Sequence, residues 1–137
     1  MTTVKEIMKH HSFTLSPFDT VMFAAEYMKD HEVGLLVVAE EGEIIGIITD
    51  RDIVIRCIAK HKDPHVTKVK EIMTLPVIHC MEDDRLDSLI KKLKDVRVQR
   101  LPVLNHKMEL IGIVSLKNLC AADFEKGGEV VSKMRSI

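Results

Sequence analysis

An internal repeat constrains this chain more than any other feature of its sequence. Residues 4–8 (VKEIM) recur unchanged as residues 69–73, an offset of 65. Residues 46–49 (GIIT) return as residues 112–115 (GIVS), an offset of 66. Similar segments in the same order and at nearly the same spacing indicate a tandem duplication, with one residue inserted between them. The chain must therefore fold as two similar halves.

Each half is expected to follow a β-α-β-β-α order. In the first half, hydrophobic patterning predicts strands near residues 13–15, 35–39 and 43–49, a helix with the apolar stripe Val21, Ala24, Ala25 and Met28, and a helix near residues 51–60. In the second half it predicts strands near residues 77–80, 101–104 and 110–115, and helices near residues 86–94 and 117–124. The pattern therefore favours an α+β fold.

The two repeats are assigned to residues 4–62 and 66–124, and residues 125–137 form a C-terminal tail. A half of about 60 residues buries too little surface to be stable alone, so we expect the repeats to pack on each other about a pseudo-twofold axis. The tail contains two adjacent glycines and mixed polar residues. We expect it to be loose or to face a partner.

Composition narrows the classes of partner. Lys and Arg (20) nearly balance Asp and Glu (21), so no strong field attracts nucleic acid or an anionic membrane. Four Phe, one Tyr and no Trp leave few stacking platforms for single-stranded nucleic acid. No apolar run reaches membrane-spanning length, and residues 1–6 lack the apolar core of a signal peptide. Three widely spaced cysteines fit reduced thiols, so we predict a cytoplasmic protein.

The stretch of residues 46–52 (GIITDRD) carries the clearest chemistry. It reads as a buried strand that turns directly into a helix, whose free N–H groups favour an anion. Thr49 offers a hydroxyl to a phosphate or sugar, and Arg51 adds positive charge. Asp52 offers two acceptor oxygens, which suit neighbouring ribose hydroxyls. The stretch thus suggests a nucleotide site, although Thr49 and Asp52 could equally be helix caps alone.

The paired motifs, VKEIM twice, L-x-V-V or L-P-V-L, and then G-I-I-T and G-I-V-S, resemble the cystathionine-β-synthase (CBS) domain. Two in tandem look like a Bateman module, and the resemblance covers residues 4–124. It implies a regulatory module, with no catalysis and no required cofactor, that binds an adenosine-containing ligand such as AMP, ADP or ATP between the repeats. It also implies a homodimer and a regulated protein partner.

The resemblance implies two ligand clefts. In the first, Thr49 would contact phosphate and Asp52 would accept the ribose hydroxyls, and the other residues expected there are Arg51, Thr74, Pro76, Val77, Val98, Gln99 and Arg100. The second departs from the family pattern because Asn118 stands where the pattern has Asp. We expect it to be weaker, and to be formed by Ser115, Asn118, Lys9, His11, Ser12, Phe13, Val33 and Gly34.

Two other classes of function stay open. Asn118 supports an interaction scaffold whose clefts are vestigial. A nucleotide hydrolase is less favoured, because the sequence offers no P-loop, no Ser-His-Asp set and no general base near Thr49. The sequence has seven histidines but contains no C-x-x-C or H-E-x-x-H pattern, so we predict no metal site. We also predict that the protein is not an enzyme.

Overall fold

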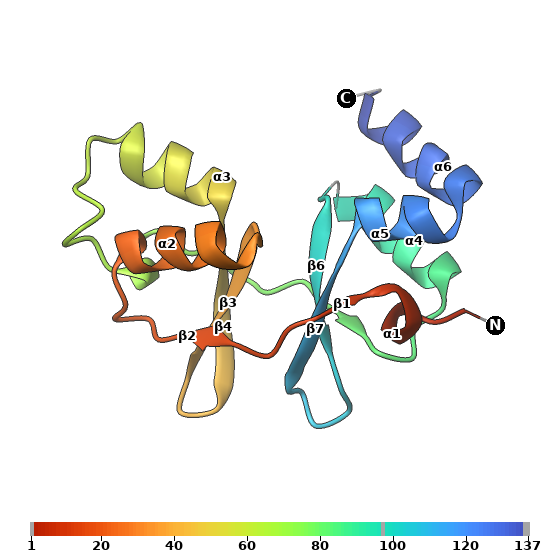
Figure 1. The fold of residues 1–137 in the computed structure, drawn as a ribbon, viewed down its shortest axis with the longest axis horizontal. Helices are drawn as coiled ribbons and strands as arrows, with labels where there is room; N and C mark the ends of the chain where they lie inside the picture. The colour runs from red at the N-terminus through yellow and green to blue at the C-terminus, as the bar shows by residue number, and fades with distance from the viewer. Residues whose placement is uncertain (1, 97, 136–137) are drawn as a thin grey trace. The chain divides into compact units, whose positions relative to one another are not determined.

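The computed structural model describes residues 2–96 and 98–135 and divides the chain into two compact units (Figure 1). Unit 1 combines the N-terminal residues up to Ser12 with the chain from Ile78 onward, and unit 2 is Phe13–Val77. The units therefore cut across the sequence repeats: the opening segment of each repeat belongs to the unit that the other repeat mainly forms. Both units are mixtures of helix and sheet, so the α+β class is confirmed.

Unit 2 contains one three-stranded sheet of order β2-β3-β4, in which β2 runs parallel to β3 and β4 antiparallel to it. Its elements are β2 (Thr14–Leu15), α2 (Val21–His31), β3 (Leu35–Glu40), β4 (Glu43–Thr49), α3 (Asp50–Asp52), the π-helix η1 (Ile53–Ile58) and the 3₁₀ turn η2 (Val69–Glu71). The predicted apolar stripe of α2 is buried at Val21, Ala24 and Met28. It packs in the core with Leu36 and Ile48 of the sheet.

Unit 1 contains a four-stranded sheet of order β1-β7-β6-β5. Its elements are α1 (Val4–Ile7), β1 (Lys9–His10), β5 (Cys80–Met81), α4 (Leu86–Val96), β6 (Arg100–Leu104), β7 (Leu110–Ser115), α5 (Leu116–Ala122) and α6 (Phe124–Arg135). The core joins Leu89 and Leu93 of α4 to Leu101, Leu119 and Val130. Like the core of unit 2, this core consists of apolar side chains from helices and strands, as expected for a duplication.

The two repeated motifs contact each other, each time across the repeats. The sulfur of Met73 lies against Gly46, and that of Met8 lies against Gly112. A Cβ on either glycine would meet the methionine side chain at less than 3.0 Å, so each glycine lets the methionine approach the strand closely. The VKEIM motif of one repeat therefore packs on the G-I-I-T or G-I-V-S motif of the other, which explains why both motifs occur twice.

Backbone hydrogen bonds also join the opening segment of one repeat to the glycine-containing strand of the other. The Thr74 N–H donates to the Ile47 carbonyl at 2.7 Å, and the Ile47 N–H donates back at 3.2 Å. At the equivalent positions of the other unit, Lys9 of β1 pairs with Ile113 of β7. The sequence predicted neither pairing, because a two-residue strand carries no periodicity of its own.

The C-terminal segment differs from the loose or partner-facing tail that the sequence suggested. Residues Phe124–Arg135 form α6, which packs on α5 and α4 and buries Val130 completely. Gly127 lies inside this helix against the backbone and sulfur of Cys120. Gly127 thus permits close helix packing, and the glycine pair does not break the helix. Residues 136–137 lie outside the described residues. Within the described residues, no helix is long and apolar enough to cross a membrane.

Candidate functional site

Strand β4 ends at Thr49, and the chain turns there into α3. The Thr49 hydroxyl accepts from the Asp52 N–H at 3.1 Å, and the Asp52 carboxylate accepts from the Thr49 N–H at 3.0 Å. This reciprocal capping box satisfies two backbone donors at the helix start. Helix capping is therefore one role of both residues, and any contact with a ligand comes in addition to it.

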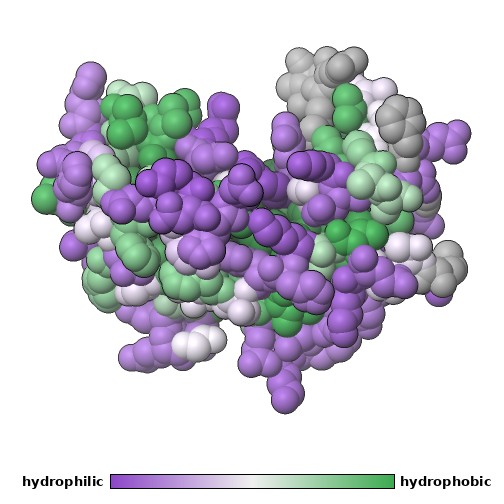
Figure 2. Space-filling model, in the orientation of Figure 1, coloured by the Kyte–Doolittle hydropathy of each residue, from purple (hydrophilic) through white to green (hydrophobic). Residues whose placement is uncertain are grey.

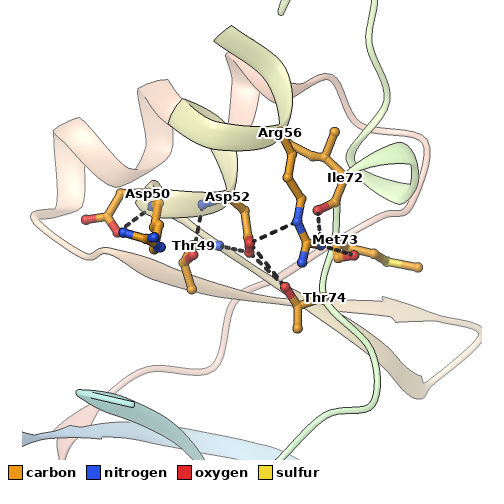
Figure 3. Close-up of polar contacts among 8 residues, drawn as sticks. Thr49, Asp50, Asp52, Arg56, Ile72, Met73 and Thr74 are labelled. Atoms are coloured by element: carbon orange, nitrogen blue, oxygen red, sulfur yellow. Dashed lines mark hydrogen bonds and ion pairs between the residues drawn. The ribbon is translucent and has the colours of Figure 1, made fainter. Parts of the chain in front are cut away.

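The carboxylate of Asp52 also contacts the opening segment of the second repeat. The Thr74 hydroxyl donates to Oδ1 at 3.1 Å and to Oδ2 at 3.2 Å (Figure 3). Asp52 is only 9% exposed, so these hydrogen bonds lie in a largely water-free setting. Three of the predicted site residues, Thr49, Asp52 and Thr74, therefore lie together, and we call this group the first corner.

Arg56 joins the first corner, although the sequence analysis did not select it. Its Nε lies 3.7 Å from Asp52 Oδ1, and its Nη1 donates to the carbonyls of Ile72 at 3.1 Å and Met73 at 3.2 Å (Figure 3). The available signal was the spacing, since Asp and Arg four residues apart face each other on a helix. Arg56 thus links the carboxylate to the chain just before Thr74.

The first corner can bind hydroxyl groups. A carboxylate accepts about four hydrogen bonds, and Asp52 accepts one from a backbone N–H and a shared one from Thr74. The carboxylate can therefore accept further hydrogen bonds. In the described part of the chain, no three His, Cys, Asp or Glu side chains are grouped so as to hold a metal ion.

The other predicted first-cleft residues are divided between the units. Arg51 is exposed next to Asp52, Pro76 is exposed and Val77 is half-buried, all in unit 2. Val98, Gln99 and Arg100 lie in unit 1, before and at the start of β6. That they form one site with Thr49 stays a prediction.

Ser115 and Asn118 form the second corner, at the end of β7. The Asn118 N–H donates to the Ser115 hydroxyl at 3.1 Å, and the Ser115 N–H donates to Asn118 Oδ1 at 3.0 Å. The same amide oxygen also accepts from the Ser115 hydroxyl at 3.0 Å. The capping box of the first corner is therefore reproduced, but its one side-chain oxygen already accepts two bonds from Ser115.

The remaining residues predicted for the second cleft are also divided between the units. Unit 1 holds Lys9, His11 and Ser12; Lys9 pairs with Ile113, and the His11 N–H donates to the Ile111 carbonyl at 3.1 Å. Unit 2 holds Phe13, Val33 and Gly34. The ring of Phe13 stacks on Tyr27 at 4.1 Å between centroids. Their joint role in a ligand site stays a prediction.

The cysteines of the described residues show no sign of activation. Cys57 is fully buried in the core of unit 2. Burial raises the pKa of the Cys80 thiol to about 12. A thiol with so high a pKa carries almost no thiolate near neutral pH and is a poor nucleophile.

Comparison with known proteins identifies the family to which the sequence is similar. The sequence profile of the CBS domain matches residues 4–58 and 69–125. The CBS domain-containing protein YhcV of Bacillus subtilis is 34% identical over 119 residues, which are 87% of this chain and 84% of YhcV. The uncharacterized protein MK0525 of Methanopyrus kandleri is 35% identical over 118 residues, 85% of this chain but only 60% of that protein.

A solved structure with a similar fold contains adenosine derivatives. The CBS domain pair of protein MJ0100, solved in complex with 5′-methylthioadenosine and S-adenosyl-L-methionine, has a TM-score of 0.80 and 28% sequence identity. The match covers 91% of this chain and 98% of that one.

Proposed function

Because this chain belongs to the CBS domain family and carries two of its repeats, we propose that it is a regulatory module that binds an adenosine-containing ligand. One observation carries the proposal: the buried carboxylate of Asp52 accepts hydrogen bonds from the Thr49 N–H and from the Thr74 hydroxyl. The MJ0100 pair, which contains two adenosine derivatives, supports the same class of ligand. We propose AMP, ADP or ATP as ligands for this chain.

The ribose is the part of the ligand that suits the first corner. The two oxygens of Asp52 would accept hydrogen bonds from the 2′ and 3′ hydroxyls, which strengthens recognition because the acceptor is charged. Thr49 and Arg51 would face the phosphate, with Arg100 adding charge. Pro76 and Val77, together with Val98 and Gln99, would form the slot for adenine.

Ligand binding would act on the connection between the units. Thr74 lies four residues before Ile78, where the chain passes from unit 2 into unit 1. A ribose that binds Asp52 beside the Thr74 hydroxyl would therefore add contacts next to this connecting segment. Any preference of the ligand for one arrangement of the segment shifts the population toward it, and this linkage is the regulatory mechanism that we propose.

An exposed apolar surface suggests how the module associates. Val54, Ile55 and Ile58 of η1 are 55%, 45% and 52% exposed. Figure 2 shows hydrophobic surface over the helix that continues from α3. Large apolar side chains that face water in a group mark interaction sites. We propose that this surface forms a homodimer and that a regulated protein partner reads the state of the dimer in the cytoplasm.

Thermal unfolding in the presence of AMP, ADP, ATP and S-adenosylmethionine tests the proposal. A true ligand at a hundredfold its Kd stabilises the folded state by about 2.7 kcal/mol. Asp52→Asn is the matched variant, because Asn118 forms the same capping box in the second corner. We expect the ligand-induced shift to disappear in this variant. If none of the four ligands changes the melting temperature of the wild-type protein, the interaction-scaffold alternative gains instead.

A further inference from the structure

Arg56 makes contacts that reach beyond its own helix. Its side chain is 48% exposed, yet one nitrogen donates to two successive carbonyls, those of Ile72 and Met73. Another nitrogen lies 3.7 Å from Asp52. The planar guanidinium suits this double task, because its donors have a fixed geometry. A half-exposed ion pair alone contributes little to stability, so the contacts to the carbonyls are the informative ones.

The duplication provides an internal control for these contacts. At an offset of 66, Asp52 corresponds to Asn118 and Arg56 corresponds to Ala122. The second repeat therefore lacks both the carboxylate and the guanidinium while it keeps the capping box. The second corner forms its capping box without an arginine at this position, so helix capping does not require Arg56. The arginine occurs only in the repeat whose capping side chain is a carboxylate.

We propose that Arg56 is a positioning residue of the first corner, an inference that rests on the proposed function for its ligand. By binding the carbonyls of Ile72 and Met73, it fixes the segment that carries Thr74. The hydroxyl of Thr74 then stays within hydrogen-bond distance of Asp52, and the carboxylate keeps the orientation in which it accepts a diol. Arg56 does not itself contact the ribose in this arrangement.

The first part of the test needs no ligand. Hydrogen exchange is measured at the amides of Ile47 and Thr74, which pair with each other. In Arg56→Ala, loss of charge-assisted hydrogen bonds predicts roughly tenfold faster exchange at both amides, while the core amide of Val38 keeps its rate. Lys60→Ala removes one exposed positive charge near the same helix and should leave all three rates unchanged. Equal rates at Ile47 and Thr74 in Arg56→Ala and wild type would overturn the positioning role.

The second part measures discrimination between AMP and 2′-deoxy-AMP by calorimetry. A charged acceptor for the 2′ hydroxyl predicts that wild-type protein prefers AMP by about tenfold or more. Arg56→Ala should bring this affinity ratio close to one. Arg56→Lys keeps the charge but not the planar set of donors, and it should retain part of the preference for AMP. A purely structural role would weaken both nucleotides equally and leave the ratio unchanged.

The outcomes separate the two proposals. If wild-type protein binds neither nucleotide, the proposed function fails, and hydrogen exchange alone decides the role of Arg56. If wild-type protein prefers AMP and Arg56→Ala keeps the full preference, the proposed function stands and the role of Arg56 in the site is refuted.

Discussion

The first and second corners share one backbone arrangement but differ in the side chain that completes the capping box. Asp52 and Asn118 each accept from the N–H of the preceding Thr or Ser. Asp52 has a second oxygen and a charge, which Thr74 and Arg56 contact, whereas the Asn118 oxygen is already used by Ser115. Since the amide is sufficient for capping, the carboxylate of Asp52 is distinguished by its contacts with Thr74 and Arg56, and ligand recognition is the further role that we propose for it.

The helices that follow the corners differ in a second way. Val54 and Ile55 of η1 correspond to Cys120 and Ala121 of α5. In unit 1 the position of Cys120 is covered by Gly127 of α6, whereas Val54 at the equivalent place is exposed. The small residue Cys120 therefore lies where the chain supplies its own covering helix, and the larger apolar residue Val54 is exposed at the equivalent place. This contrast supports a surface for association on unit 2.

Ligand affinity should show the largest difference between the corners. Replacing Asp52 by Asn makes the first corner like the second and removes charged hydrogen bonds, which should cost about 1.5–3 kcal/mol of binding free energy for AMP. Titration calorimetry measures this loss. The control is Asn118→Asp, which leaves the first corner intact and should not weaken its affinity. Equal affinity of wild type and Asp52→Asn would mean that the two corners are equivalent for the ligand.

The two repeated glycines should differ in their tolerance of alanine. At Gly112 an added Cβ would lie 2.8 Å from the backbone oxygen of Lys9, which cannot easily move. At Gly46 the close atoms belong to the side chains of Met73 and Leu75, which can adjust. We expect Gly112→Ala to lower the free energy of unfolding by about 2–3 kcal/mol and Gly46→Ala by about 1 kcal/mol. Urea denaturation measures both, and the reverse order would contradict this account of the packing.

Removing the capping hydroxyls should affect both units alike. Thr49→Ala and Ser115→Ala each delete one acceptor for a helix N–H, and each should lower the free energy of unfolding by about 1 kcal/mol. Only Thr49→Ala should also weaken AMP binding. Chemical denaturation with and without the nucleotide distinguishes the two effects, and a loss of binding in Ser115→Ala would point to a ligand in the second corner.

The smallest effect on stability is expected at the exposed apolar surface. Ile55→Glu should change the free energy of unfolding of the monomer by no more than about 0.5 kcal/mol, because the side chain is exposed. It should nevertheless prevent the proposed homodimer from forming, since the interface would have to bury the new charge. Ala121→Glu is the equivalent variant in unit 1 and should leave the dimer intact. Sedimentation velocity reports both, and dimers of Ile55→Glu would exclude this interface.

The sequence predicted the elements that carry strong periodicity. The helices α2 and α4 and the strands β3, β4, β6 and β7 occur where hydrophobic patterning placed them. It did not predict α6, because Gly127 and Gly128 read as a break, although Gly127 is needed for contact with Cys120. It also placed an ordinary helix at residues 51–60, whereas residues Ile53–Ile58 are a π-helix, a local winding that has no simple sequence signal.

A local motif selected residues that the structure brings together, although their role in binding a ligand stays a prediction. The motif identified Thr49 and Asp52, and the family resemblance added Thr74, which lies beside them. Arg56 was missed because its importance depends on carbonyl groups 16 and 17 residues away in the chain. Contacts of this kind depend on how the repeats exchange their opening segments, and spacing within one repeat does not contain that information.

The packing of each VKEIM methionine on a glycine of the other repeat also bears on how such a chain could have arisen. A polypeptide with a single repeat would contain both the methionine and the glycine. In the pairing seen here, however, the two residues of each contact come from different repeats. Two such polypeptides could satisfy this contact by trading their leading segments. In the present chain one polypeptide supplies both leading segments, and a fragment cut at the repeat boundary would lose a contact that residues 13–77 retain.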